Sequence, residues 1–358
     1  MTSDPYKRLA ERLDALPNGY PATESGVELR LLALIFTPEE AALAAQLRLT
    51  LETPAQIAAR LGGDPKALRD QLKAMAKKGL ISAGRAEGGF GYGLMPFAVG
   101  IYEAQAGRID AEFAQIFEDY YHQAFAQALT IQPQVHRVIP VHQSVQVDME
   151  VRPFESAADI IANARSWGVL DCICRVQKAL IGEPCHHPVD VCMIMSPRAG
   201  SFDHSDIIRP LTQDEAMATL RRAAEAGLVH SVSNSQEGIW YICNCCTCAC
   251  GVLRGMADLG IANVVARSAF LNHVNEDTCI GCGECVEYCQ FNALTLDDVV
   301  HVDEIRCVGC GVCVPACPQE ALVLVRRPER DVPQTPATEE EWRVERARAR
   351  GVDLGQVL

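Results

Sequence analysis

A cysteine motif near the C-terminus, present in two copies, constrains this chain more than any other feature. Its spacing is C-x-x-C-x-x-C-x-x-x-C, and the second copy follows the first at a period of 28 residues. Glycines beside the cysteines allow the tight turns that bring three thiolates together. Structural zinc sites use two pairs of ligands rather than two runs of four, so the spacing favours metal clusters over zinc. The first copy holds Cys279, Cys282, Cys285 and Cys289, and the second holds Cys307, Cys310, Cys313 and Cys317.

The doubled motif resembles the bacterial dicluster ferredoxins, which bind two 4Fe-4S clusters. The resemblance implies that each cluster takes three ligands from one copy and the fourth from the other. The first cluster would use Cys279, Cys282, Cys285 and Cys317, and the second would use Cys307, Cys310, Cys313 and Cys289. The first copy departs from the family pattern because Gln290 follows its last cysteine where proline is usual. We expect this change to reduce the shielding of one cluster from water without removing a ligand.

Nine further cysteines lie in the middle of the chain, and five of them fall within eight positions. Cysteines that act only as small apolar residues do not cluster beside Asn and Thr, so this run predicts metal ligands. If the run is a strand, Cys243 and Cys245 face one side and Cys246 the other. Adjacent ligands are too close to surround a cluster alone, so we expect shared ligation of one or two additional iron–sulfur clusters, with zinc as the alternative metal. The candidates are Cys172, Cys174, Cys185, Cys192, Cys243, Cys245, Cys246, Cys248 and Cys250.

Polar residues near these cysteines each allow two interpretations. His186 and His187 could be ligands, although a histidine pair beside a proline in a loop is more often at the surface. Arg175 and Lys178 could offset cluster charge or bind an anionic substrate, and a purely structural role fits them equally well. No G-x-G-x-x-G turn leads from a strand into a helix, so the sequence contains no NAD or flavin motif.

The N-terminal part predicts short helices followed by a hairpin. A proline follows a capping residue at Thr37, Thr53 and Asp64, and each pair predicts a helix start. The third helix would end at Gly79, ahead of a glycine-rich turn between two short strands. This order resembles the winged-helix domains of bacterial transcription regulators. In that resemblance residues 65–78 form the reading helix, and the DNA contacts would be Lys66, Arg69 and Lys73.

The distribution of charge argues against a strong DNA-binding surface. Residues 53–95 contain seven bases and three acids, whereas DNA-binding domains usually carry a denser basic stripe. The whole chain has a net charge of −14, and residues 275–325 contain nine acids and one base. An acidic surface around a redox centre favours docking onto a basic partner, although solubility alone explains it equally well. We therefore expect a redox partner with a basic docking face, with DNA as the weaker alternative.

These segments together predict an α+β multidomain protein. Residues 97–129 predict one long helix that packs on the N-terminal domain or forms the arm of a homodimer. A second helix and hairpin, around residues 212–243, predict a winged-helix-like unit within the middle domain. The expected layout is a winged-helix-like domain with a following helix at 1–130, a cysteine-rich iron–sulfur domain at 131–270, a dicluster ferredoxin domain at 271–327 and a flexible charged tail at 328–358.

The combination resembles a family of bacterial and archaeal iron–sulfur proteins. In that family a winged-helix region precedes a CxCR segment, a CNCC-type run and a C-terminal dicluster ferredoxin. The resemblance implies electron transfer, by a carrier or an oxidoreductase subunit rather than a stand-alone enzyme. The alternatives are a redox- or oxygen-sensing winged-helix transcription regulator, and a reductase with a substrate-facing cluster in the middle domain.

Seventeen cysteines without a signal peptide predict a cytoplasmic protein. No stretch approaches the roughly 20 apolar residues of a membrane helix, so we expect no membrane insertion.

Overall fold

The computed structural model describes residues 4–141, 144, 150–262 and 264–358. The chain divides into two compact units, which are described separately below. The first contains Met1–Ile131, Val176–Glu183 and Arg343–Leu358, and the second contains Gln132–Arg175 and Pro184–Trp342. Among the described residues, no helix has both the length and the apolar character needed to cross a bilayer.

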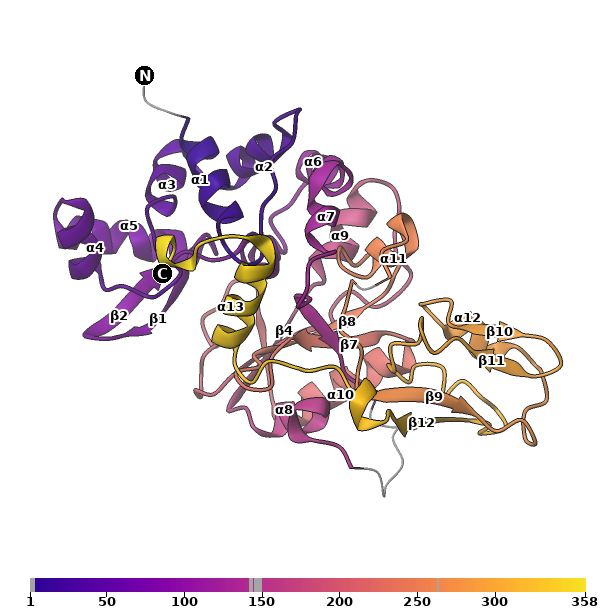
Figure 1. Ribbon diagram of the computed structural model, residues 1–358. Helices are drawn as coiled ribbons and strands as arrows, with labels where there is room; N and C mark the ends of the chain where they lie inside the picture. The colour runs from indigo at the N-terminus through magenta and orange to yellow at the C-terminus, as the bar shows by residue number, and fades with distance from the viewer. Residues whose placement is uncertain (1–3, 142–143, 145–149, 263) are drawn as a thin grey trace. The chain divides into compact units, whose positions relative to one another are not determined.

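The first unit begins with five helices and a hairpin (Figure 1). The predicted helix starts are confirmed: Thr37 and Thr53 each form a capping box, and the Asp64 carboxylate accepts a hydrogen bond from the backbone of Ala67. The elements are α1 (Pro5–Asp14), α2 (Val27–Ile35), α3 (Pro38–Ala44), α4 (Pro54–Leu61), α5 (Pro65–Lys77), β1 (Ser82–Ala86) and β2 (Gly89–Gly93).

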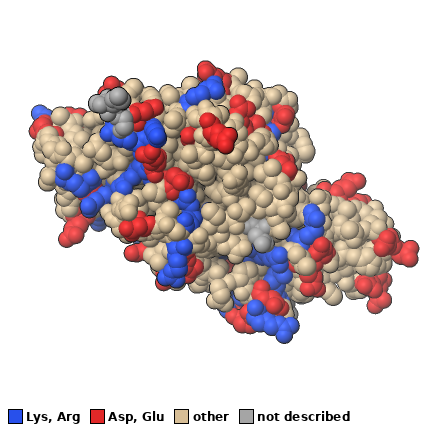
Figure 2. Space-filling view, turned by 45° about the horizontal axis from the view of Figure 1, so that its top comes forward, with Lys and Arg blue, Asp and Glu red and all other residues tan. Residues whose placement is uncertain are grey.

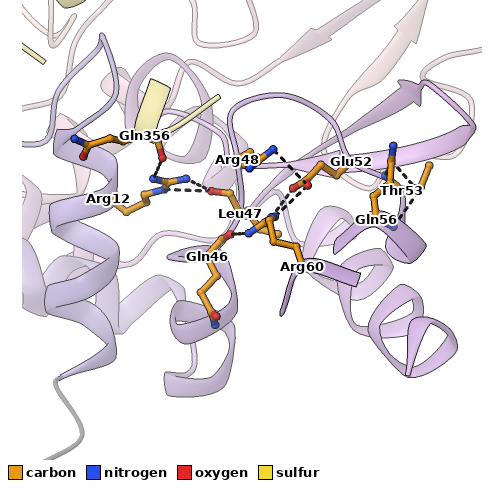
Figure 3. A network of polar contacts seen from close by, with 9 residues as sticks. All are labelled: Arg12, Gln46, Leu47, Arg48, Glu52, Thr53, Gln56, Arg60 and Gln356. Carbon is orange, nitrogen blue, oxygen red and sulfur yellow. Dashed lines mark hydrogen bonds and ion pairs between the residues drawn. The ribbon is translucent and has the colours of Figure 1, made fainter. Parts of the chain in front are cut away.

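Glu52 joins the hairpin to the segment that precedes α4. Its backbone exchanges two hydrogen bonds with Tyr92 of β2, which adds a short third strand beside the antiparallel β1–β2 pair. Its carboxylate lies between Arg48 and Arg60, as Figure 3 shows. Helices α4 and α5 followed by this hairpin have the element order expected of a winged helix, and that classification stays a prediction.

Residues 97–129 form several short helical segments rather than the single long helix that we expected. Gly107 adopts a positive φ of 79°, and α6 (Ala111–Tyr120) then starts afresh with Asp110 as its N-cap. A π-helical turn (Tyr121–Phe125) and α7 (Ala126–Ala128) complete the segment. Its aromatic side chains pack on one another, with the rings of Tyr102 and Phe117 stacked at 4.2 Å.

The C-terminal segment, for which we expected a flexible charged tail with one short helix, contains helix α13 (Glu339–Arg350). Arg346 in this helix is 1% exposed, and its guanidinium donates to the carbonyl oxygens of Pro17, Ala128 and Ile131. Arg350 pairs with Asp14 at 2.7 Å. Hydrogen bonds to these carbonyl oxygens therefore fix α13 in place, although the charge of its sequence alone suggests a mobile segment.

The second unit is built around a six-stranded antiparallel sheet in the order β3-β7-β8-β5-β4-β6. Helices α8 (Ala157–Ala162) and α10 (Gln213–Glu225) share one apolar core with a face of the sheet, and Thr212 forms a capping box at the start of α10. The hairpin after α10 belongs to this larger sheet. The strands are β3 (His136–Val138), β4 (Ser166–Leu170), β5 (Cys192–Ser196), β6 (Arg209–Leu211), β7 (Val229–Ser233) and β8 (Tyr241–Cys245).

Helix α8 ends at Ala162, and Ser166 and Trp167 already belong to β4. Two further helices flank the cysteine-rich segments. They are α9 (Ile173–Leu180) and α11 (Arg254–Leu259).

The doubled cysteine motif lies between two small antiparallel strand pairs, labelled at the right of Figure 1. Strands β9 (Phe270–Val274) and β12 (Leu322–Arg326) form the outer pair, and β10 (Leu294–Leu296) and β11 (Val300–Val302) form the inner one. Helix α12 (Glu284–Tyr288) lies within the first copy of the motif. Cysteines from both copies share a core with Leu294, Val300 and Leu322.

Candidate metal centres

Four cysteines of the doubled motif line one hollow. Two come from the turn that leads into α12, one lies in the first turn of α12, and the fourth comes from the end of the second copy. Burial raises the pKa of Cys285 to about 11, and the neighbouring thiolates of Cys317, Cys282 and Cys279 add to the effect. The set is Cys279, Cys282, Cys285 and Cys317.

The other four cysteines of the motif also lie near one another. Burial raises the pKa of Cys310 to about 12, with further contributions from the thiolates of Cys307 and Cys289. Burial likewise raises the pKa of Cys313, to which Cys310 and Cys289 contribute. Cys289 of the first copy therefore lies with the three leading cysteines of the second copy.

The two copies repeat their backbone geometry as well as their sequence. Gly281 and Gly309 have φ of 65° and 69°, and a Cβ on them would lie 2.5 Å from the carbonyl oxygen of Asp298 and 2.0 Å from that of Phe270, respectively. Only glycine fits at such a close approach. This packing lets each turn present several cysteines to the same space.

Amide groups donate hydrogen bonds to the last sulfur of each copy. The backbone N–H of Ala293 donates to Cys289 Sγ, and that of Ala321 donates to Cys317 Sγ, both at 3.3 Å. The Asn272 side chain donates to Cys313 Sγ at 3.3 Å. Donors around sulfur stabilise the negative charge of thiolates that ligate iron. The residues present therefore fit two iron–sulfur clusters.

The nine middle cysteines separate into two sets. Six thiols form a closed ring of neighbours, hereafter the six-cysteine set. Side-chain hydrogen bonding links the pKa of each thiol to that of the next in the order Cys172, Cys174, Cys250, Cys245, Cys243 and Cys192, and links the last to the first.

The six-cysteine set is assembled on the sheet face opposite α8 and α10. Met193 and Ile242 pair across β5 and β8 and belong to the core shared with these helices. Because side chains alternate along a strand, the adjacent Cys192 and Cys243 point to the other face, and Cys245 follows two residues later. The end of β4 and the start of α9 bring Cys172 and Cys174 to the same place.

The remaining three middle cysteines converge with one histidine, in what we call the four-ligand set. Cys185 Sγ lies 3.3 Å from Cys248 Sγ, 3.6 Å from Cys246 Sγ and 3.1 Å from His187 Nδ1. The four potential ligand atoms all lie within 4.8 Å of one another. Cys246 directly follows the last residue of β8 and joins a different set from Cys243 and Cys245.

Arg175 is 2% exposed and lies against the four-ligand set. Its guanidinium donates to the carbonyl oxygens of Pro188 and Asn244 and to Cys246 Sγ, the last at 3.5 Å. Burial lowers the pKa of Arg175, but nearby thiolates outweigh that effect and raise the pKa overall. The pKa of Cys246 falls to about 3 because Cys248 hydrogen-bonds to it, with help from His187 and Arg175. A thiolate at Cys246 is thus available to a metal at neutral pH.

The other predicted polar residues are placed differently. Lys178 is buried and pairs with Glu118 at 3.3 Å, which favours a structural role. His186 stacks on His187 but does not belong to the four-ligand set. Lys66, Arg69 and Lys73 are exposed on α5, where Arg69 pairs with Asp70 at 3.0 Å.

Sequence reasoning did not anticipate the separation into two sets. Cys185-x-His187 and Cys246-x-Cys248 are two ligand pairs of equal spacing. This equal spacing was the sequence signal that could have indicated a separate four-ligand set.

Gln290 connects the doubled motif to the middle cysteines. Its side-chain oxygen accepts a hydrogen bond from the backbone N–H of Thr247 at 2.8 Å, and its amide group donates to the carbonyl oxygen of Gly227. Thr247 lies between two members of the four-ligand set, and Gln290 directly follows Cys289.

Comparison with known families identifies one part of the chain. Residues 278–321 match the family model of the 4Fe-4S dicluster domain. Comparisons with curated proteins and with solved structures find no match. With its many cysteines, this part of the chain is therefore a ferredoxin-like iron–sulfur region.

Proposed function

We propose that the protein transfers electrons through two 4Fe-4S clusters in residues 279–317, either as a carrier or as a subunit of an oxidoreductase system. The match of this region to the dicluster family carries the proposal. The placement of Cys317 and Cys289 with the leading cysteines of the opposite copy supports ligation across the two copies.

The protein's contribution is to bury, orient and polarise the ligands. When bound, each cluster takes up and releases single electrons. Cys285 and Cys313 are 5% and 7% exposed, which keeps water away from their sulfur atoms. The amide donors at Ala293 and Ala321 stabilise added negative charge, and such hydrogen bonds are one determinant of reduction potential.

The acidic surface of the ferredoxin-like region supports a redox partner with a basic docking face. On the ferredoxin-like region, at the right of Figure 2, acid side chains (red) stand out on the face in view. Together with the nine acids and one base in residues 275–325, this favours electrostatic steering toward a basic docking face.

We further propose that the six-cysteine set holds an additional iron–sulfur cluster. Six buried or half-buried thiols from three segments of the chain converge on one sheet face. Thiolates without a metal at this density would repel one another, so a bound metal would relieve the repulsion.

The regulator alternative has less support from the side chains around the hairpin. Arg60 pairs with Glu52, Arg69 with Asp70, and Lys78 with Glu40 at 2.7 Å. These pairs reduce the basic charge available to DNA phosphates. Nanomolar, redox-dependent protection of a palindromic DNA site would favour the regulator over the carrier.

Counting iron and acid-labile sulfide on the full chain, purified without oxygen, tests the proposal. We expect about eight irons from the ferredoxin-like region, more from the middle, and spin-coupled EPR signals after reduction. Fewer than about eight irons per chain after anaerobic reconstitution would contradict it.

A further inference from the structure

The four-ligand set has the geometry of a mononuclear metal site. We infer that Cys185, His187, Cys246 and Cys248 bind one zinc ion, separately from the iron–sulfur ligands. The sulfur atoms of Cys185 and Cys248 are 3.3 Å apart, and those of Cys185 and Cys246 are 3.6 Å apart. Tetrahedral zinc with Zn–S bonds of about 2.3 Å separates its sulfur ligands by about 3.8 Å. The observed distances are close to that value and need only small adjustments.

The same distances exclude an iron–sulfur cubane and a disulfide as alternatives at the four-ligand set. A cubane holds each thiolate on a different iron, which places the sulfur atoms about 6 Å apart. The four atoms here lie within 4.8 Å of one another, too close to surround a cluster. A disulfide needs an S–S separation of about 2 Å, well below the distances in this set.

The donor set identifies the metal. Three thiolates and one imidazole are a common combination for structural zinc, which is four-coordinate. All four positions are filled by protein, so the site leaves no position for water or substrate. Because zinc has no redox chemistry, the site does not take part in electron transfer.

Charge balance supports the same assignment. Zn²⁺ with three thiolates and a neutral imidazole carries one net negative charge. The buried guanidinium of Arg175, 3.5 Å from Cys246 Sγ, supplies the matching positive charge. Two backbone carbonyl groups fix its orientation, as expected of a residue that supports metal ligands.

The zinc ion would connect the loop that contains Cys185 to the turn after β8. This loop leads into β5, which starts at Cys192, and β8 ends at Cys245. Cys192 and Cys245 are both members of the six-cysteine set. Zinc therefore fixes two of the segments that assemble the neighbouring iron–sulfur ligands, although its own ligands are distinct from theirs.

The first test is a measurement on the unmodified full chain, purified without oxygen and loaded with iron. Elemental analysis should find about one zinc per chain, and zinc-edge X-ray absorption should show three sulfur atoms and one nitrogen. Absence of zinc, or zinc bound by four sulfur atoms, would overturn the proposal whatever the variants show.

Matched variants then locate the site. His187→Ala should lower zinc retained against a chelator at least tenfold, while His186→Ala, at the stacked neighbour, should retain it. Cys192→Ser should lower iron and retain zinc. Reduced-cluster EPR signals of the ferredoxin-like region report folding in each variant. Equal zinc loss in both histidine variants, or loss of iron rather than zinc in His187→Ala, would contradict the assignment.

Discussion

The ferredoxin-like region and the middle of the chain are both rich in cysteine, but their sulfur atoms are arranged differently. The first places four cysteines around a hollow, and among the described residues its cysteines form no group with all ligand atoms within 4.8 Å. The middle contains one group that is this tight and a ring of six thiols beside it. Sulfur spacing, more than cysteine number, thus distinguishes a cluster site from a single-ion site.

The regions also differ in how the chain assembles them. The ferredoxin-like region uses one local motif twice, with matched glycines and matched amide donors. The middle brings together a loop, two strand ends and a turn that are distant in sequence.

The largest expected effect tests ligation across the two copies. If the clusters share ligands as proposed, Cys279→Ser with Cys317→Ser removes two ligands of one cluster and should lower iron by about four per chain. Cys279→Ser with Cys289→Ser removes one ligand from each cluster and should lower iron by up to about eight. Iron analysis of the purified variants provides the measurement. The opposite ranking would show that each copy ligates its own cluster.

The next effect concerns the six-cysteine set. Cys172→Ser should remove about four irons from the middle and leave the spin-coupled EPR signal of the ferredoxin-like region unchanged. Iron counting and EPR on the same sample separate the two regions. Unchanged iron in this variant would mean that the ring of thiols binds no cluster.

A third effect comes from two buried histidines of the middle region, whereas the described histidines of the ferredoxin-like region are exposed. Burial lowers the pKa of His230 and of His136 to about 4, from the ordinary 6.5. His273 and His301 of the ferredoxin-like region are exposed. Between pH 6.5 and pH 4 the unfolded chain binds protons that the folded chain excludes.

Their stabilising contribution is therefore complete above about pH 6.5 and is lost as the pH falls toward 4. Each histidine changes the free energy of unfolding by up to about 1.4 kcal/mol per pH unit. His230→Gln should weaken this dependence, measured as the unfolding midpoint at pH 7 and pH 5 without oxygen. An identical pH dependence in the variant would show that His230 is not buried in its neutral form.

The smallest effect is on docking. The rate of electron transfer from the reduced protein to a basic partner should fall about tenfold as salt rises from low to physiological concentration. Stopped-flow measurement with a basic and an acidic acceptor checks it. A rate that is independent of salt would remove the argument for a basic docking face.

Sequence reasoning succeeded where the signal was local. Helix starts at Pro38, Pro54 and Pro65 followed from their caps, and the doubled motif followed from its spacing. It failed for the long helix over residues 97–129, where Gly107 and the Asp110 cap start a new segment.

Apart from the equal spacing of the two ligand pairs, the sequence held no signal for the partition of the middle cysteines, because the partition depends on strand register. Met193 pairs with Ile242, which sets Cys192 beside Cys243 and leaves Cys246 beyond the strand. Register is a tertiary property set by packing. The burial of Arg175 could not be predicted either, because the carbonyl groups that surround it come from distant segments of the chain.

Gln290 attaches the first copy of the motif to other segments of its unit. The two copies of the motif differ at the residue after their last cysteine, which is Gln290 in the first copy and Pro318 in the second. Proline at this position would have no side-chain amide to receive the N–H of Thr247 or to reach Gly227. The departure from the family pattern is also an attachment point, which joins the first copy to the middle cysteines, and its effect on shielding stays a prediction. Gln290 thus ties the first copy of the motif to the turn that contains Cys246 and Cys248.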